Sequence, residues 1–321
     1  MTAFDVFNGD ADGICALTQL RLAEPRTAEI VTGVKRDIAL LERVAAAPGD
    51  AVTVLDISMA SNRDALDRVL EAGADVFYVD HHHAGTVPGH DRLHAILNDA
   101  PDVCTSLLVN GHLGNRYRAW AAVGAFGDNL HDSARAILRP LGLADDEVAR
   151  LADLGTYINY NGYGARIEDL HVPPDELFRM VSPHADPFDF IGEARDCFER
   201  LAEGYRGDMA AAESLTPASH STDTAAVLML PDASWARRVS GVYGNELCNR
   251  FPDRAHALLT AMPDGGYVVS VRAPKNRKRD ADVLCREFPT GGGRPAAAGI
   301  NVLPEAEVGT FVDRFVNCYA A

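Results

Sequence analysis

Val79-Asp80-His81-His82-His83 is the stretch of sequence that most directly predicts the fold. The apolar residues 74–78 precede it, and the turn-forming pair Ala84-Gly85 follows it. An apolar run rich in Val and Phe that ends in an acid and imidazoles predicts a buried strand with a polar tip. Carboxylates and imidazoles are metal ligands, so the stretch indicates a metal site. Taken alone, it is equally compatible with a polar surface loop.

The same arrangement, an apolar segment followed by an aspartate, recurs elsewhere in the chain. The aspartates are Asp10 and Asp12 in the turn at residues 8–13, Asp56 after residues 51–55, and Asp128 after residues 120–127. Two carboxylates two residues apart on a glycine-bounded turn can point at one spot, which suits a hard dication. Aspartate in a turn also caps backbone groups, so the first of these motifs is weak by itself.

Alternating apolar strands and amphipathic helices predict an α/β fold with a parallel sheet. Strands are predicted at residues 3–7, 30–33, 51–55, 74–79 and 93–98, and helices at residues 14–22, 38–47 and 63–73. In such a sheet, ligands gather beyond the carboxyl ends of the strands. The candidate ligands that follow strands there are Asp10, Asp12, Asp56, Asp80 and His81.

The middle of the chain is predicted to be helical, with loops that leave alternatives open. A helix that starts near Asp102 would present free N–H groups to a phosphate, or Asp102 would simply cap it. Residues 141–212 indicate helices joined by polar loops. Within them, residues 159–164 are predicted to be either a substrate-facing loop or an ordinary turn rich in Asn and Gly.

The last hundred residues have an α+β pattern. Strands are predicted at residues 227–230, 257–262 and 267–272, a long helix at residues 238–250 and a short one at residues 282–288. Residues 291–299 are predicted to form a glycine-rich loop whose backbone N–H groups can approach a phosphate. The basic residues 275–279 lie shortly upstream, and a solvated loop explains them equally well.

Composition and charge restrict the class of partner. The 321 residues carry 46 acidic and 30 basic side chains, a formal net charge of −16. That charge repels polyanions and argues against binding of duplex nucleic acid. No apolar run approaches the ~20 residues that span a bilayer, and no signal peptide is recognisable, so no membrane association and a cytoplasmic location are expected. The six scattered cysteines are typical of a reducing compartment.

The ordered motifs resemble those of the DHH phosphoesterase family, which carries an associated C-terminal domain. The resemblance rests on residues 8–13, Leu55-Asp56, Asp80-His81-His82 and Gly127-Asp128, and extends into the C-terminal region. Size and plan are most similar to family members that degrade dinucleotides and short RNAs. The resemblance implies a parallel-sheet catalytic domain at residues 1–185, a helical linker at residues 186–220 and a smaller α+β substrate-binding domain at residues 221–321. The active site is expected in the cleft between the two domains.

The resemblance also implies roles for individual residues. Two divalent cations are expected, with Mn²⁺ favoured over Mg²⁺, and with Asp56 bridging them. Asp12, His81 and Asp128 would complete one ion's ligands, and Asp10 would serve the other. Asp80 and His82 are the expected catalytic residues, with Asp80 orienting a metal-ligating imidazole and His82 contacting the phosphate. The predicted substrate-binding residues are Asn8, His83, Ser270, Arg272, Gly292, Gly293 and Arg294, of which His83 has no assigned contact.

Two positions depart from the family pattern. Val6 stands where many members have a histidine that serves the same ion as Asp10, and the Asn8 amide oxygen is a candidate replacement. Arg294 stands where the C-terminal motif commonly has a histidine. Arginine is a strong phosphate donor, so phosphate binding is expected to persist, whereas any role of a neutral imidazole is lost.

From the residues and the resemblance together we predict a two-metal phosphodiesterase that hydrolyses short oligonucleotides or linear dinucleotides to mononucleotides. The alternatives are a phosphoanhydride or phosphomonoester hydrolase acting on pyrophosphate, polyphosphate or a phosphoadenosine nucleotide, and a cyclic dinucleotide phosphodiesterase. A non-catalytic nucleotide-binding regulator is a further alternative, suggested by Val6. The expected partner is the short nucleotide substrate. The oligomeric state stays open, with a homodimer among the alternatives.

Overall fold

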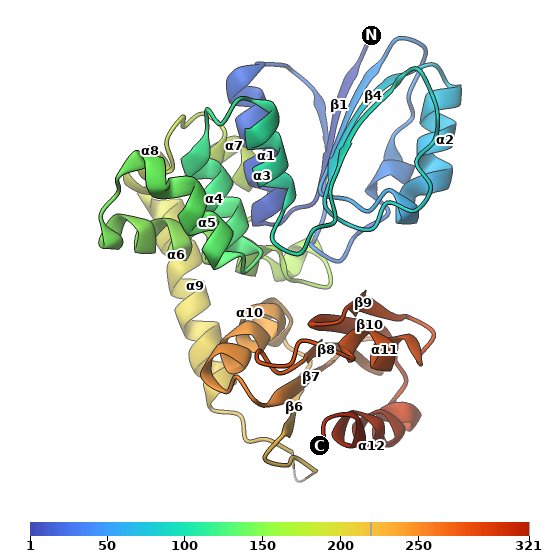
Figure 1. Ribbon diagram of the computed structural model, residues 1–321, viewed down its shortest axis with the longest axis vertical. Helices are drawn as coiled ribbons and strands as arrows, with labels where there is room; N and C mark the ends of the chain where they lie inside the picture. Colours follow the sequence, from blue (N-terminus) through green and yellow to red (C-terminus); the bar gives the residue numbers. More distant parts are fainter. Residues whose placement is uncertain (219, 321) are drawn as a thin grey trace. The chain divides into compact units, whose positions relative to one another are not determined.

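A parallel β-sheet is the centre of the N-terminal part of the protein (Figure 1). The computed structural model describes residues 1–218 and 220–320. Within those residues, the first sheet has the strand order β2-β1-β3-β4-β5 and every neighbouring pair is parallel. Its strands are β1 (Ala3–Phe7), β2 (Glu29–Val31), β3 (Ala51–Leu55), β4 (Asp75–Asp80) and β5 (Leu93–Leu97). The predicted α/β class with a parallel sheet is therefore confirmed.

Helices cover both faces of this sheet, with α1 and α3 on one side and α2 on the other (Figure 1). The helices are α1 (Ala11–Ala23), α2 (Arg63–Glu71), α3 (Thr105–His112), α4 (Arg118–Gly127), α5 (His131–Leu138), α6 (Asp145–Gly162), α7 (Pro174–Val181), α8 (Pro187–Glu193) and α9 (Arg195–Glu213). Alternate strand residues enter separate cores, because successive side chains of a strand point to opposite faces. Phe7, Leu55 and Val79 pack with α1 and α4, and Val6, Val54 and Tyr78 pack with α2.

The strand order reverses direction across the sheet at β1 and β3. The chain leaves β1 through α1 and returns to β2 on one side, whereas β3 pairs with the other side of β1. At such a reversal the loops after the two central strands diverge, which leaves room for a ligand between them. Asp10 and Asp56 lie in those two loops.

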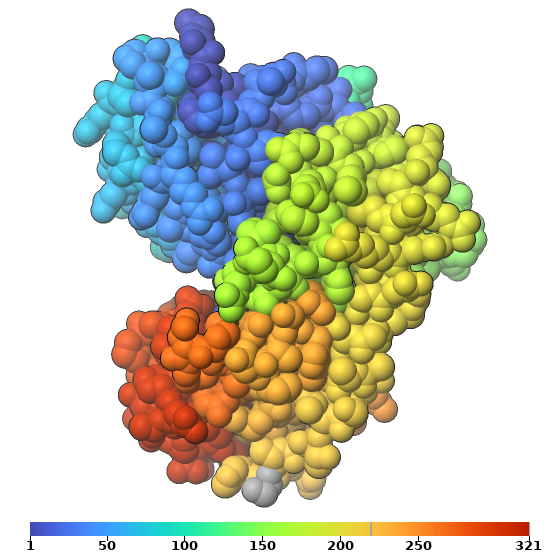
Figure 2. Space-filling view, turned by 180° about the vertical axis from the view of Figure 1, so that it is seen from behind, coloured from blue at the N-terminus to red at the C-terminus, as the bar shows by residue number. Residues whose placement is uncertain are grey.

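Two predicted segments differ from the structure. The helix expected at residues 38–47 is wrong, since only a 3₁₀ turn at Leu40–Arg43 forms. The Asn62 side chain donates to the Ile38 carbonyl at 2.7 Å and accepts from the Leu41 N–H at 3.3 Å. These bonds replace those of a helix. Residues 159–162, expected in a loop, form the last turn of α6. The chain then reaches the surface at residues 165–168, in yellow-green in Figure 2.

The chain divides into two compact units, Met1–Glu203 and Gly204–Ala321, so the division falls within α9. The second unit has a mixed sheet with the strand order β6-β7-β8-β10-β9. Its elements are β6 (Ala225–Leu230), α10 (Ser234–Arg250), β7 (Ala255–Ala261), β8 (Tyr267–Arg272), α11 (Ala281–Arg286), β9 (Gly291–Arg294), β10 (Ala297–Leu303) and α12 (Val308–Cys318). The predicted hairpin of β7 and β8 is confirmed.

The glycine-rich segment at residues 291–299 is a hairpin of β9 and β10 rather than a loop. Glycine is required there for close approach of the two strands. At Gly293, where φ is +138°, an added Cβ would lie 2.5 Å from the Ala298 Cα. In residues 1–218 and 220–320, no helix has the length and apolar character needed to cross a bilayer.

Glycines also allow α4 and α6 to pack backbone against backbone. A Cβ added at Gly155 of α6 would lie 2.2 Å from the Val123 carbonyl oxygen of α4. At Gly127 of α4, an added Cβ would lie 2.4 Å from the Ala11 Cβ of α1 and 3.0 Å from the Gly155 carbonyl oxygen of α6. This close packing brings the end of α4, which is followed by Asp128, against the start of α1, which contains Asp12.

We predict that Gly155→Ala lowers the free energy of unfolding by about 1–3 kcal/mol, because the methyl group overlaps a buried backbone oxygen. Gly111 of α3 provides the matched control, since an added Cβ there meets nothing within 4 Å. Gly111→Ala should be neutral or stabilise by up to about 1 kcal/mol. Urea denaturation of both variants measures the difference. Equal stabilities would contradict the proposed packing of α4 on α6.

Candidate metal centre

Carboxylates from several elements meet at the carboxyl edge of the first sheet. Asp10 follows β1 and caps α1 by accepting from the Gly13 N–H at 3.1 Å. Asp56 follows β3, Asp80 is the last residue of β4, and Asp128 follows α4. The predicted ligands therefore lie at neighbouring strand ends and at the end of the helix that packs against α1.

Asp12 is fixed by the N-terminus of α3. The Thr105 and Ser106 N–H groups each donate to one of its carboxylate oxygens at 2.7 Å. Both predictions for the start of this helix are wrong. Asp12 accepts from the N–H groups that were predicted to bind a phosphate. The N-cap residue is Cys104 and not Asp102. Burial and then the Asp128 charge raise the pKa of Asp12, while His81 and the Ser106 N–H oppose the rise.

His81 faces three of these carboxylates. Its Nδ1 lies 2.9 Å from the Val103 carbonyl, which can only accept, so Nδ1 donates a hydrogen bond there and Nε2 is the ring nitrogen left for another partner. Nε2 lies 3.4 Å from Asp56, 3.4 Å from Asp128 and 3.8 Å from Asp12. The ring nitrogen and these carboxylate oxygens are close enough together to bind one cation. The residues therefore fit a divalent metal ion.

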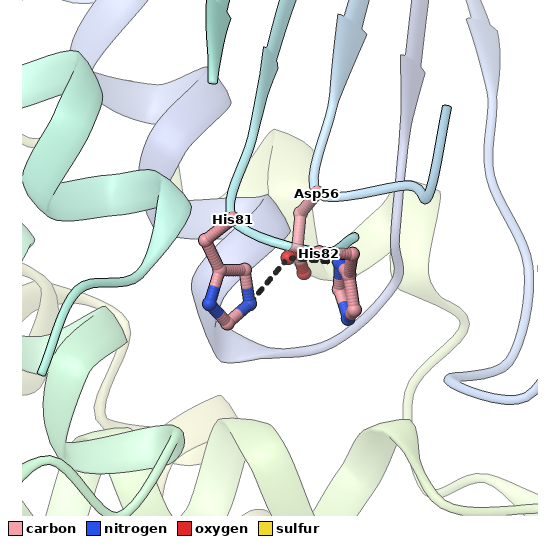
Figure 3. A group of neighbouring side chains, drawn as sticks. All are labelled: Asp56, His81 and His82. Atoms are coloured by element: carbon pink, nitrogen blue, oxygen red, sulfur yellow. Dashed lines mark ion pairs between the residues drawn. The ribbon is translucent and has the colours of Figure 1, made fainter. Parts of the chain in front are cut away.

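Asp56, which points toward His81 and His82 in Figure 3, is held in an unusual backbone conformation. Its φ of +59° is left-handed, which costs a non-glycine residue about 1 kcal/mol or more. Its N–H donates to the Val79 carbonyl at 3.1 Å, and the Thr105 hydroxyl donates to its side chain at 3.2 Å. Burial, followed by the charges of Asp10 and Asp12, raises the pKa of Asp56 well above its usual range. A bound cation would offset this repulsion.

Asp80 pairs with His82 rather than with His81. Its carboxylate accepts from His82 Nδ1 at 2.7 Å, which leaves Nε2 of that imidazole as the outer nitrogen. Burial is the largest single influence and lowers the pKa of His82, but the hydrogen bond to Asp80 and the charges of Asp80 and Asp56 together outweigh it, and the pKa is raised. Figure 3 shows His82 beside Asp56. His83 is exposed, and its backbone carbonyl accepts a hydrogen bond from the Ser58 hydroxyl at 3.2 Å.

Asp10 is paired with a lysine that the sequence analysis did not identify. Lys35 Nζ hydrogen-bonds Asp10 Oδ2, and lies 2.9 Å from the Asn159 side-chain oxygen and 3.5 Å from Asp128. Burial alone would lower the pKa of Lys35, but Asp10, then Tyr163 and Asp128, hold it well above its usual range. Lys35 follows β2 but is not an acid or an imidazole, and Asn159 lies within α6, so the pattern of strands that end in an aspartate marks neither residue.

Val6, which departs from the family pattern, and Asn8, its candidate replacement as a ligand, are both buried. Val6 is 1% exposed and packs in the core beneath α2. The Asn8 amide nitrogen donates to the Lys35 carbonyl at 3.2 Å, whereas its side-chain oxygen has no hydrogen-bond partner among the described residues. That oxygen is open to a cation or a donor, in keeping with the role suggested for Asn8.

Three predicted substrate-binding residues of the second unit, Ser270, Arg272 and Arg294, share one face of its sheet. Arg272 pairs in register with Ala297, which in turn pairs with Arg294. Directly paired residues of antiparallel strands point to the same face. Arg272 is held by the Asn245 side chain at 2.8 Å and by the Ser270 hydroxyl at 3.0 Å. The remaining members of the set, Gly292 and Gly293, lie on β9 beside them.

Comparison with known proteins relates this fold to solved structures. No model of a known protein family matches the chain. No curated protein matches it in sequence. The exonuclease RecJ bound to manganese is 18% identical with a TM-score of 0.62, covering 99% of this chain and 90% of RecJ. The pGpG-specific phosphodiesterase PggH from Vibrio cholerae is 15% identical with a TM-score of 0.56, covering 100% of this chain and 99% of PggH.

An exopolyphosphatase-related protein from Bacteroides fragilis is 14% identical with a TM-score of 0.51, covering 99% of this chain and 92% of that protein. These likenesses extend over nearly the full length of each structure, and identities this low bear on the fold alone. The chain has the two-domain fold of the DHH phosphoesterases, as its ordered motifs predict.

Proposed function

We propose that this protein is a metal-dependent phosphodiesterase that hydrolyses short oligonucleotides or linear dinucleotides to mononucleotides. The observation that carries the proposal is the position of His81 Nε2, which lies within 3.8 Å of the carboxylates of Asp12, Asp56 and Asp128. These groups lie at the reversal point of a parallel sheet, where α/β proteins bind ligands. A regulator without catalysis would not require this set of ligands.

The residues that would hold a divalent cation are Asp12, Asp56, His81 and Asp128. A mixed imidazole and carboxylate set favours Mn²⁺ over Mg²⁺, and the likeness to a manganese-bound exonuclease supports the same ion. A bound dication polarises a phosphoryl oxygen and lowers the pKa of water. The α3 N-terminus orients Asp12, and the Val103 carbonyl orients His81, so the ligands are positioned before the ion binds.

His82 is the group we expect to contact the scissile phosphate. Asp80 binds its Nδ1 and favours the protonated ring, so Nε2 can donate to a phosphate oxygen. In the second unit, we expect Arg272 and Arg294 to bind phosphate or base of the nucleotide, with Ser270 holding Arg272. Arginine suits this role because its guanidinium group can donate two parallel hydrogen bonds to one phosphate.

The net charge of −16 favours a short substrate, because a long polyanion would be repelled. Likeness to a pGpG-specific phosphodiesterase over the full chain supports a linear dinucleotide. A second candidate, hydrolysis of a phosphoanhydride, is favoured by the likeness to an exopolyphosphatase-related protein.

The substrate class is tested by the relative rates on pGpG, di- to pentanucleotides, cyclic dinucleotides, pyrophosphate and polyphosphate in Mn²⁺. We expect turnover of linear dinucleotides to be fastest and to fall with length. Fastest turnover of polyphosphate would favour the second candidate. No turnover of any of them would contradict the proposed function.

We predict that Asp56→Asn removes bound Mn²⁺ and lowers kcat on pGpG by at least about 100-fold, because an amide binds a dication more weakly than a carboxylate. Asp75 on β4 is the matched control, since its side chain is 63% exposed. Asp75→Asn should keep both Mn²⁺ content and kcat. Metal analysis and steady-state kinetics measure the two quantities. Full activity of Asp56→Asn would exclude the proposed ligand set.

We predict that Asp80→Asn moves the alkaline limb of the pH–rate profile to lower pH. Asp80 raises the pKa of His82, and the protonated ring is the active form, so activity is lost as pH rises through that pKa. Removing the carboxylate lowers the pKa, and the loss then begins at lower pH. An alkaline limb that stays in place would rule out His82 as the phosphate donor.

A further inference from the structure

Lys35 lies where the resemblance would place a second metal ion. Its Nζ contacts Asp10 Oδ2 and the Asn159 oxygen, and approaches the Tyr163 ring with 5.4 Å between Nζ and the ring centroid. Asp10 is the ligand assigned to that second ion. An ammonium group surrounded by a carboxylate, an amide oxygen and an aromatic face has the surroundings of a bound cation.

The backbone of Lys35 is anchored on both sides. Its N–H donates to the Gly162 carbonyl at the end of α6 at 2.8 Å, and its carbonyl accepts from the Asn8 amide at 3.2 Å. The end of α6 also lies close to Asp10, because a Cβ added at Gly162 would be 3.1 Å from the Asp10 Cα. The fold therefore holds the lysine against Asp10 through two independent backbone contacts.

Asp128 joins the lysine to the metal centre. One of its oxygens lies 3.4 Å from His81 Nε2 and the other 3.5 Å from Lys35 Nζ. Asp10 has both oxygens engaged, one by the Gly13 N–H and one by Lys35. Among the described residues, the two groups with metal-ligand geometry both contain His81, and neither contains Asp10. The residues around Asp10 therefore lack the ligand geometry for a divalent metal ion that the residues around His81 have.

We propose that the Lys35 ammonium takes the place of the second divalent cation, so that each chain binds one dication instead of the two expected from the family resemblance. The inference rests on the proposed metal centre at His81. The ammonium provides a fixed positive charge beside Asp10 and Asp128. Val6 supports this proposal, because valine cannot bind a metal at the position where many family members have a histidine ligand of the second ion.

Mn²⁺ binding to the full-length chain tests the proposal, with stoichiometry from calorimetric titration and the spin state from electron paramagnetic resonance. The wild-type chain should bind one Mn²⁺ with the spectrum of an isolated ion. Lys35→Met keeps the side-chain length and removes the charge, which frees Asp10 Oδ2 and the Asn159 oxygen. This variant should bind two Mn²⁺ and show spin coupling between them. Lys35→Gln repeats the test where the methionine variant does not fold.

Lys275 provides the matched control, because it is exposed and hydrogen-bonds Asn249 at 3.0 Å in the second unit. Lys275→Met should bind one Mn²⁺, as the wild type does. Two ions in the wild-type chain would overturn the proposal while leaving the proposed function intact. One ion in folded Lys35 variants would also overturn it. No Mn²⁺ in the wild-type chain would contradict the proposed function itself.

Discussion

Mutual repulsion among buried carboxylates is the constraint on which the site depends. Asp10, Asp12 and Asp56 are each at most 2% exposed, and Asp128 lies beside them. Negative charges gathered in a poorly hydrated place are unfavourable unless positive charge or N–H donors compensate them. The structure provides such compensation at separate points, namely the α3 N-terminus at Asp12 and Lys35 at Asp10. The remaining charge, around His81, is what a divalent cation would neutralise.

The fold concentrates these charges through general properties of its elements. Parallel strands end at one edge of the sheet, so acids that follow different strands become neighbours whatever their distance in sequence. Close packing at Gly127 and Gly155 brings the end of α4 to the same edge. Asp56 tolerates a left-handed backbone there, and its neighbours Thr105 and Val79 hold it in place. The backbone strain at Asp56 and the repulsion among the carboxylates lower the stability of the fold at this edge. A bound cation would relieve the repulsion, so stability is lost where a ligand would bind.

The strand-tip acids could be predicted from sequence because they depend on local patterns. An apolar run ending in aspartate is visible in a short window, and the α/β alternation then places the tips together. Lys35 could not be found in this way, because its role depends on tertiary contacts with α6 and Asn8. The same reason explains the failed helix at residues 38–47, where Asn62 supplies bonds from elsewhere in the chain. The glycine-rich hairpin was misjudged because glycine permits both phosphate loops and close strand pairing.

The central claim is that His81, Asp12, Asp56 and Asp128 bind one divalent cation. Anomalous diffraction at the manganese absorption edge, from crystals of the full chain grown in Mn²⁺, tests it most directly. We expect a peak within about 2.0–2.3 Å of His81 Nε2 and of oxygens from these aspartates. A peak elsewhere with none beside His81, or no peak in crystals soaked to saturation, would contradict it.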